Sequence, residues 1–516
     1  MHEGGIVRTM RLAELMGTLS LASDAAMGLP AEHGLRAAAV AVRLGEIAGM
    51  ADRDRADAFY LTLMRYAGCT ADADIAAYVM GDEKAVRAAL YGVDFGSPLE
   101  FLPAMMRAVS AGRGVLGGAA AVAQALARMP KLMATAQSHC EVGERMASRF
   151  GFGERFRGAL FQAFERWDGG GWPRHVKGEA IEPAMRLVHV AEEIEVGHRL
   201  GGVEGARALA RRRARRLLDP RVVEAFDAHA AEVCAALDVP SAWAAALAAE
   251  PRAWKTVDDD GLDEALRTLG DFADLGSRFT RTHASGVSAL VREAATRAGM
   301  NDTDARTLAR AALIHDLGRV GVPAAIWDKA GPLTDLEWER VRTHTYLGER
   351  ILARAEGLAP VAAIATLAHE RLDGAGYHRR LDAASCKGPA RLLAAADVYH
   401  AMIEDRPQRR ARSKDEAAAE LSSMARARSL CPDAVAAVLS AAGHAAARRR
   451  DRPCGLSDRE VEVLRLVARG LTNKEVAAAL GISTKTAGNH LQNLFGKLGV
   501  TTRAAATAFA MQEGLA

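Results

Sequence analysis

Apolar residues recur at intervals of three and four along most of the chain. Over residues 287–297 and 304–313, for example, leucine, valine and alanine return at the spacing of one helix face. Runs of alternating apolar and polar residues, which are typical of strands, are nearly absent. Alanine is the best helix former and is abundant, whereas aromatic residues make up only 5% of the chain. The pattern predicts an all-α fold.

The composition is that of a soluble globular protein with two to four domains. The chain has 516 residues, of which 50% are hydrophobic and 25% charged, with a net charge of +3. This balance does not by itself indicate a polyanionic partner. The six cysteines show no CxxC spacing, and no apolar run reaches the length of a membrane span. We therefore expect a cytoplasmic protein that has no membrane partner.

The chain contains an internal repeat. Residues 12–69 resemble residues 262–319 at a constant offset of 250, which aligns His33 with His283. Further on, FERWDGGGW from Phe164 resembles HERLDGAGY from His369 at an offset of 205. The difference of 45 residues indicates an insertion in the first copy, between about residues 70 and 138. Two constant offsets across such different motifs indicate duplication.

The second copy carries the residue types of a two-metal hydrolytic site. Imidazole nitrogens and carboxylate oxygens suit Mn, Fe or Zn. An aspartate can bridge two ions, and ions roughly 3.5–4 Å apart can stabilise both the attacking and the leaving oxygen of a phosphate ester. The adjacent His315-Asp316 pair is the centre of this pattern, and the other candidates are His283, His344, His369 and Asp397.

The first copy has lost the centre of this pattern. Arg65 and Tyr66 stand at the positions of the His-Asp pair, and Phe164 stands at the position of His369. An arginine stays protonated and cannot be a metal ligand. We interpret His33 and its neighbours in this copy as structural remnants. The first copy then serves either as the partner of the second in an internal pseudo-dimer or as a ligand sensor.

Three motifs together resemble the HD-GYP subgroup of the HD phosphohydrolase superfamily. They are HDLGRVGVP from His315, HERLDGAGYH from His369 and AAADVYHAM from Ala394. The resemblance covers residues 262–442 directly and residues 12–237 as a degenerate copy. It implies a helical domain that binds transition metals and hydrolyses cyclic di-GMP, with Asp316 and Arg319 as catalytic residues. The metal ligands it implies are His283, His315, Asp316, His344, His369 and Asp397, with Asp316 bridging.

The chain departs from the subgroup at four positions. Ala368 replaces the first of two histidines before the glutamate, which removes one metal ligand. Arg319 replaces the lysine that closes the HD motif, and His378 replaces the proline of the GYP signature. Phe279 stands where an acidic residue would complete a third metal site. We therefore expect two divalent ions (Mn, Fe or Zn) rather than three.

The C-terminal part carries four closely spaced helix signals. Ser457 and Thr472 are each followed three residues later by glutamate, which is the capping-box pattern. Gly470 and Gly481 end the first two helices. A third helix is predicted from about Lys485 to Leu498 and a fourth from about Thr502 to Glu513. The spacing predicts a helix-turn-helix.

This part resembles the LuxR-type DNA-binding domain over its full length, from LSDREVEVLRLVARG to KLGVTTRAAA. The resemblance implies that the helix from Lys485 enters the major groove of double-stranded DNA. A homodimer is expected because such domains usually read two half-sites. The residues implied in DNA contacts are Thr472, Asn473, Lys474, Lys485, Thr486, Asn489 and His490.

The sequence thus predicts an all-α protein with two tandem HD-type helical domains and a four-helix LuxR-type helix-turn-helix domain. The predicted boundaries are 1–250 for the degenerate copy, 258–443 for the HD-GYP-like copy, 444–455 for a basic linker and 456–516 for the DNA-binding domain. We interpret the chain as a transcriptional regulator whose HD half hydrolyses a cyclic dinucleotide at a binuclear metal site. Two alternatives stay open: an inactive HD scaffold for ligand sensing and dimerisation, or hydrolysis of another phosphate ester.

Overall fold

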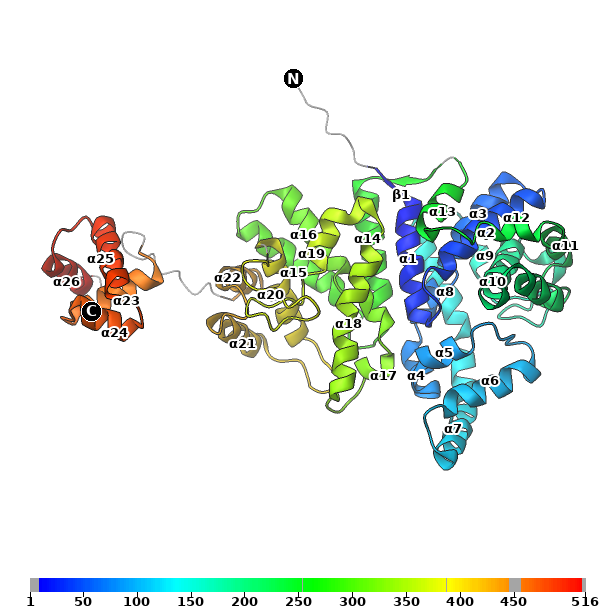
Figure 1. Ribbon diagram of the computed structural model, residues 1–516, viewed down its shortest axis with the longest axis horizontal. Coiled ribbons are helices and arrows are strands. Elements are labelled where there is room, and N and C mark those ends of the chain that lie inside the picture. Colours follow the sequence, from blue (N-terminus) through cyan, green and yellow to red (C-terminus); the bar gives the residue numbers. More distant parts are fainter. Residues whose placement is uncertain (1–8, 253, 387, 445–455, 513–516) are drawn as a thin grey trace, which may run out of the picture. The chain divides into compact units, whose positions relative to one another are not determined.

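The computed structural model describes residues 9–252, 254–386, 388–444 and 456–512, and it divides into two compact units, residues 1–442 and 443–516. Helices dominate both units, which confirms the all-α prediction (Figure 1). The strands among the described residues are the antiparallel pair β1 (Met10–Arg11) and β2 (Thr256–Val257). The predicted linker, apart from His444, lies outside the described residues. No described helix is both long and apolar enough to cross a membrane.

The larger unit contains one series of helices twice. Each series has three helices, a 3₁₀ turn and then further helices. The first series is α1 (Leu12–Met27), α2 (His33–Ile47), α3 (Asp52–Met64), η1 (Ala67–Thr70), α8 (Ala136–Arg149), α9 (Glu154–Leu160) and α10 (Pro183–Arg213). The second is α14 (Asp259–Asp274), α15 (His283–Arg297), α16 (Asp302–Ile314), η3 (Leu317–Gly321), α18 (Asp335–Leu352), α19 (Ala359–Ala365) and α20 (Gly388–Met402).

A buried aspartate ties the first two helices together in each series. Asp24 Oδ1 accepts a hydrogen bond from the backbone of Gly34 at 3.3 Å, and Asp274 Oδ2 accepts one from Ala284 at 2.8 Å. Gly34 and Ala284 each directly follow a histidine at the start of the second helix, so each aspartate holds the backbone next to that histidine. The same local bond therefore positions His33 in one half and His283 in the other.

The two halves meet through a reciprocal contact. Helix α1 packs against η3 and α18 of the second half, while α14 packs against η1 and α8 of the first. The buried apolar residues of both halves form one continuous core. Such reciprocity is the signature of a two-fold related pair. The division of this unit at residues 250–258 stays a prediction, because the two halves form one compact body.

The stretch from Asp238 to Asp260, which spans the predicted boundary between the two copies, is folded onto the first half. It contains α13 (Ala242–Ala249) as well as β2. Its alanine-rich sequence forms a helix between Pro240 and Pro251, and Trp243 packs closely against Gly17. The stretch is therefore part of the packing of the first half.

The remaining helices complete the larger unit. Four of them form the predicted insertion between η1 and α8, namely α4 (Ala73–Met80), α5 (Glu83–Ala89), α6 (Pro98–Ser110) and α7 (Val115–Ala134). At the equivalent place the second half has only α17 (Ala324–Trp327). The others are α11 (Pro220–Ala228), α12 (Ala230–Cys234), α21 (Lys414–Arg426) and α22 (Pro432–Ala441), with the 3₁₀ turns η2 (Gly178–Ala180) and η4 (Glu356–Leu358).

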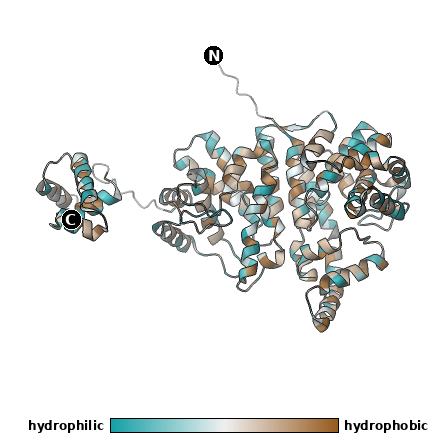
Figure 2. Ribbon diagram, viewed as in Figure 1, coloured by the Kyte–Doolittle hydropathy of each residue, from teal (hydrophilic) through white to brown (hydrophobic). Residues whose placement is uncertain are grey.

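The described residues of the smaller unit form four helices around their own apolar core. Figure 2 shows apolar and polar residues along these helices. They are α23 (Asp458–Ala468), α24 (Asn473–Leu480), α25 (Thr484–Leu498) and α26 (Arg503–Gln512). Ser457 and Thr472 form the predicted capping boxes. Ser483 caps α25, so this helix begins one residue before the predicted start. The predicted end of the fourth helix, Glu513, lies outside the described residues.

Gly68 and Gly318 lie at equivalent close contacts. A Cβ atom at either position would collide with a backbone oxygen, that of His139 or of His344. We expect Gly68→Ala and Gly318→Ala each to lower the free energy of unfolding by about 1–3 kcal/mol, because backbone must move to admit the methyl group. Gly158→Ala is the control, since no atom lies within 4 Å of its Cβ position. Thermal unfolding of the full chain measures the effect, and unchanged stability in both variants would contradict it.

Candidate functional site

Two buried carboxylates stand at the centre of the second half. Asp316 lies at the junction of α16 and η3, and Asp397 lies on α20. His283, at the start of α15, places its Nε2 atom 3.2 Å from Asp397 Oδ1 and 3.8 Å from Asp316 Oδ2. Three helices that are distant in sequence thus bring three predicted ligands together.

The other three predicted histidines surround the same carboxylates. His315 Nε2 lies 3.5 Å from Asp316 Oδ2 and 3.7 Å from Asp397 Oδ1. On the other side, His344 Nε2 and His369 Nε2 lie 3.2 and 2.9 Å from Asp316 Oδ1. Ligand atoms that share an ion at about 2.1 Å are about 3 Å apart, so these separations suit metal coordination. The histidines divide into two pairs, one at each oxygen of Asp316.

Two of the imidazoles direct into the cluster a nitrogen that makes no hydrogen bond. Nδ1 of His315 donates to the carbonyl of Ala312 at 2.7 Å, and Nδ1 of His344 donates to that of Val341 at 2.5 Å. A carbonyl oxygen only accepts, so Nδ1 carries the proton and Nε2 of a neutral ring holds a lone pair. Both Nε2 atoms are buried without a hydrogen bond. Metal-ligating histidines commonly have this arrangement.

The charges of the cluster are strongly coupled. Burial would raise the pKa of Asp316, but His315 and Arg319 hold it well below its usual value. Burial lowers the pKa of His283, whereas its hydrogen bonds to carboxylates raise it, with a net pKa of about 9. The cluster therefore needs positive charge at its centre, and a metal ion would have to compete with the proton of His283.

Comparison with protein-family models gives two matches. Residues 267–430 match the HD domain, and residues 455–510 match the model described as bacterial regulatory proteins, luxR family. The chain is an HD-domain protein with a C-terminal LuxR-type domain. The predicted resemblances to both families are thereby confirmed, and the six predicted metal ligands lie inside the HD domain.

Curated relatives of the chain are cyclic-nucleotide phosphodiesterases. The 3'3'-cGAMP-specific phosphodiesterase 3 of Vibrio cholerae is 27% identical over 424 residues, which cover 80% of this chain and 90% of the relative. A cyclic di-GMP phosphodiesterase of Thermotoga maritima is 34% identical over 168 residues, 32% of this chain and 46% of that protein.

A solved structure shares the fold. The crystal structure of a cyclic GMP-AMP specific phosphodiesterase of V. cholerae aligns with 84% of this chain and 98% of its own, with a TM-score of 0.58 and 24% identity. The alignment thus extends well beyond the HD domain, into the first half.

Glu404 is a further member of the cluster that the sequence analysis did not find. Its Oε2 atom accepts from His283 Nδ1 at 2.8 Å, and its other oxygen lies 3.3 Å from His400 Nδ1. Arg406 donates to Glu404 at 2.9 Å. This acceptor orients the His283 ring so that Nε2 points at the carboxylates. The three- and four-residue spacing of Asp397, His400 and Glu404 was the signal available in the sequence, although Glu404 lies just after the end of α20.

The residues that depart from the HD-GYP pattern have other contacts. Ala368 is fully buried in the apolar core and offers no ligand atom. His378 bonds Thr345 through Nδ1 and Glu349 through Nε2, both at 2.8 Å, so it fixes the loop rather than the cluster. Phe279 lies beside Arg278, whose guanidinium stacks on its ring.

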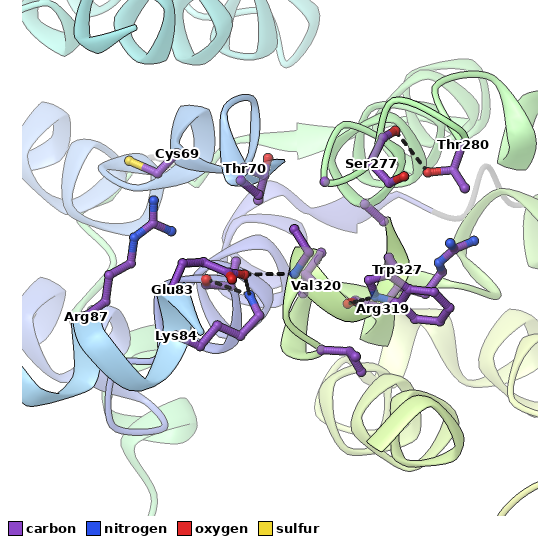
Figure 3. A pocket seen from close by; sticks show the side chains of 16 residues that line it. Cys69, Thr70, Glu83, Lys84, Arg87, Ser277, Thr280, Arg319, Val320 and Trp327 are labelled. Carbon is purple, nitrogen blue, oxygen red and sulfur yellow. Dashed lines mark hydrogen bonds and ion pairs between the residues drawn. The ribbon is translucent and has the colours of Figure 1, made fainter. Parts of the chain in front are cut away.

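Arg319 lies between the cluster and a cavity that residues of the first half also line. Its guanidinium donates to Asp316 Oδ2 at 2.9 Å and lies 4.1 Å from the ring centre of Trp327. Figure 3 shows both side chains on one side of a small cavity of about 20 Å³, with Glu83 and Lys84 of the insertion on the other. This volume suits about one water molecule. Glu83 also accepts from the backbone of Ala324 at 2.9 Å.

In the first half, an arginine occupies the equivalent position. Arg65 Nη1 lies 3.1 Å from the carboxylate of Glu192, and the hydroxyl of Tyr66 donates to the same carboxylate at 2.8 Å. Phe164 stacks on Trp172, just as His369 stacks on Tyr377 in the second half. The guanidinium of Arg65 thus supplies the positive charge beside the Glu192 carboxylate. Groups of three potential metal ligands, among the described residues, occur only in the second half.

His33 and His139 of the first half have internal partners. His33 Nδ1 lies 2.6 Å from Glu195 Oε2, and His139 Nε2 lies 2.7 Å from Asp72 Oδ2. Both pairs are largely buried and hold neighbouring helices together. These contacts support the interpretation of His33, His139 and Glu192 as structural residues.

The residues predicted to contact DNA cluster on α24 and α25. Thr472, Asn473 and Lys474 are exposed at the start of α24. Two of these have local partners, because the Thr472 hydroxyl belongs to its capping box and Asn473 Oδ1 accepts from Arg503 at 2.6 Å. Those on α25 present an exposed polar face, with His490 half-buried; they are Lys485, Thr486, Asn489 and His490.

Removal of the Glu404 carboxylate should weaken metal binding. We expect Glu404→Ala to lower the affinity of the cluster for Mn²⁺ by about 10–100-fold, because His283 loses the acceptor that orients its ring. Glu404→Gln keeps one acceptor oxygen and should lose less. Titration of the full chain against a fluorescent chelator measures the affinity, with the exposed Glu356→Ala as the control. Equal affinity in wild type and Glu404→Ala would contradict the assignment.

Proposed function

We propose that this protein is a DNA-binding transcriptional regulator whose HD domain hydrolyses a cyclic dinucleotide with two divalent metal ions, Mn, Fe or Zn. The observation that carries this proposal is the convergence of four imidazoles and two carboxylates, in which two buried Nε2 atoms face the carboxylates without a hydrogen bond. That donor set is the one that transition-metal ions prefer.

The ligands divide between the two sides of Asp316. His283, His315 and Asp397 would hold one ion together with Asp316, and His344 and His369 would hold the other on the opposite side of Asp316. When bound, such ions stabilise the charge of a phosphodiester and lower the pKa of water. Arg319 adds a fixed positive charge beside Asp316, and the stacked ring of Tyr377 holds His369 in place.

The substrate class is inferred from the relatives. Those named above act, by name, on 3'3'-cGAMP or cyclic di-GMP. Both molecules are cyclic dinucleotides, so a phosphodiester between two nucleosides is the bond we propose to be cleaved.

One observation favours a second candidate, an inactive HD scaffold. Ala368 replaces a ligand with a buried methyl group, which leaves the side of Asp316 Oδ1 with His344 and His369 alone. An ion with fewer protein ligands binds less tightly, so this side could remain empty. The HD half would then act as a ligand sensor and dimerisation module.

The C-terminal unit supports DNA binding under either candidate. Helix α25 follows α24 after a turn at Gly481, as the second helix of a helix-turn-helix does. We propose that its exposed face enters the major groove and that two copies of the chain read two half-sites.

Asp316→Ala should remove both metal and turnover. We expect wild-type protein grown with Mn and Fe to contain about two ions per chain and the variant far fewer, because the variant lacks the proposed bridging carboxylate. Hydrolysis of cyclic di-GMP and 3'3'-cGAMP should fall at least 100-fold. Elemental mass spectrometry and nucleotide chromatography measure the two effects, with the exposed Asp302→Ala as the control. Negligible metal in wild type would instead favour the inactive scaffold.

Loss of the α25 side chains should weaken DNA binding without changing metal content. We expect Lys485→Ala with Asn489→Ala to lower the affinity for a wild-type-selected operator at least tenfold, since each good base contact contributes about 1–3 kcal/mol. The control is Arg465→Ala, which removes an exposed charge from α23. The measurement is a gel-shift titration at fixed salt, and unaltered affinity in the double variant would refute the assignment.

A further inference from the structure

A second polar pocket lies within the HD half, among α14, α15 and α16. Its volume is about 280 Å³. Arginines from all three helices line it, namely Arg267, Arg292, Arg306 and Arg310. Ser285 and Ser288 add hydroxyl groups, and Ala289, Ala309 and Leu313 add apolar surface. The six residues of the metal cluster are not among the lining residues.

The internal repeat shows what occupies the equivalent place in the first half. The offset of 250 places Gly17, Leu35, Val42 and Tyr60 of the first half at the positions of Arg267, Ser285, Arg292 and Arg310. The groove of the first half is apolar, and α13 packs there against α1 and α2, with Trp243 on Gly17. In the second half, polar and charged residues replace this apolar lining. Such a surface does not suit an alanine-rich helix and suits an anion.

The four arginines are of two kinds. Arg306 and Arg310 donate to the two oxygens of Asp263 at 2.9 and 2.5 Å, so they are held in place and partly neutralised. Arg267 and Arg292 are exposed, and neither side chain makes a hydrogen bond or ion pair with the described part of the chain. Two guanidinium groups are thus free for a ligand.

We propose that this pocket binds a nucleoside monophosphate. Guanidinium groups bind phosphate oxygens in a bidentate manner and stack on flat rings, so Arg267 and Arg292 suit the phosphate. The base would lie against Ala289 and Leu313. The volume is near the lower end of the range for small-molecule pockets, which favours a mononucleotide over a larger ligand.

The helices that line the pocket also carry residues of the metal cluster, so a bound ligand would act on the cluster through these helices. Helix α15 begins with His283, and α16 ends immediately before His315. A nucleotide that joins α14, α15 and α16 would stabilise the arrangement of these two histidines. The pocket itself does not depend on an active metal centre, so the proposal stands apart from the proposed hydrolysis.

The test is calorimetric titration of the full chain with GMP and AMP. It is carried out in the Asp316→Ala background, so that nucleotide bound at the metal cluster does not contribute. We expect saturable binding of at least one nucleotide and at least a tenfold loss in Arg267→Ala with Arg292→Ala. The control is Arg145→Ala with Arg297→Ala, which removes the same charge from exposed arginines outside the pocket.

Three outcomes would overturn the proposal. The first is absence of saturable nucleotide binding, and the second is equal binding in the pocket variant and its control. The third is equally tight binding of inorganic phosphate, which would show that the pocket recognises an anion alone. A loss of operator affinity in the pocket variant, without any nucleotide binding, would assign the arginines to DNA phosphates instead.

Discussion

Two buried carboxylates impose the main electrostatic constraint on the second half of this protein. Asp316 and Asp397 lie in the interior, where an uncompensated charge is costly. Four imidazoles and Arg319 surround them, and two imidazole lone pairs face them without a hydrogen bond. The need for a central cation explains why segments from five places in the sequence converge here. It also explains the role of Glu404, which keeps the His283 ring in a useful orientation.

The first half meets the same constraint in a different way. Arg65 places a covalently attached cation beside Glu192, so no ion is needed to balance this carboxylate. The stacked pair of Phe164 and Trp172 retains the shape of the corresponding pair in the second half without its ligand nitrogen. The half has therefore kept the packing of an HD domain while its central charges are satisfied internally. Because the two halves contact each other reciprocally, residues of the insertion line the same small cavity as Arg319.

The sequence was a good guide wherever a residue type acts through local spacing. The capping boxes at Ser457 and Thr472 formed as predicted, because they involve residues three positions apart. The six ligand types were identified from motifs, and the fold does bring them together. Glu404 was missed because its role depends on His283, more than one hundred residues earlier. The stretch around α13 spans the predicted boundary between the two copies, and in the structure it packs on the first half. Prolines and acidic residues mark linkers and helix ends equally well, so the local sequence did not indicate this packing.

By itself, the sequence determined the helical class, the duplication, the two families and the chemical types at the candidate site. These follow from periodicity and from local motifs, which do not depend on how distant segments meet. Tertiary packing determined which oxygen of Asp316 each histidine faces and that the two halves share one core. It also placed Trp243 in one groove and left arginines around its counterpart. Such features depend on contacts between residues far apart in the chain, and their energies depend on burial, which no local pattern specifies.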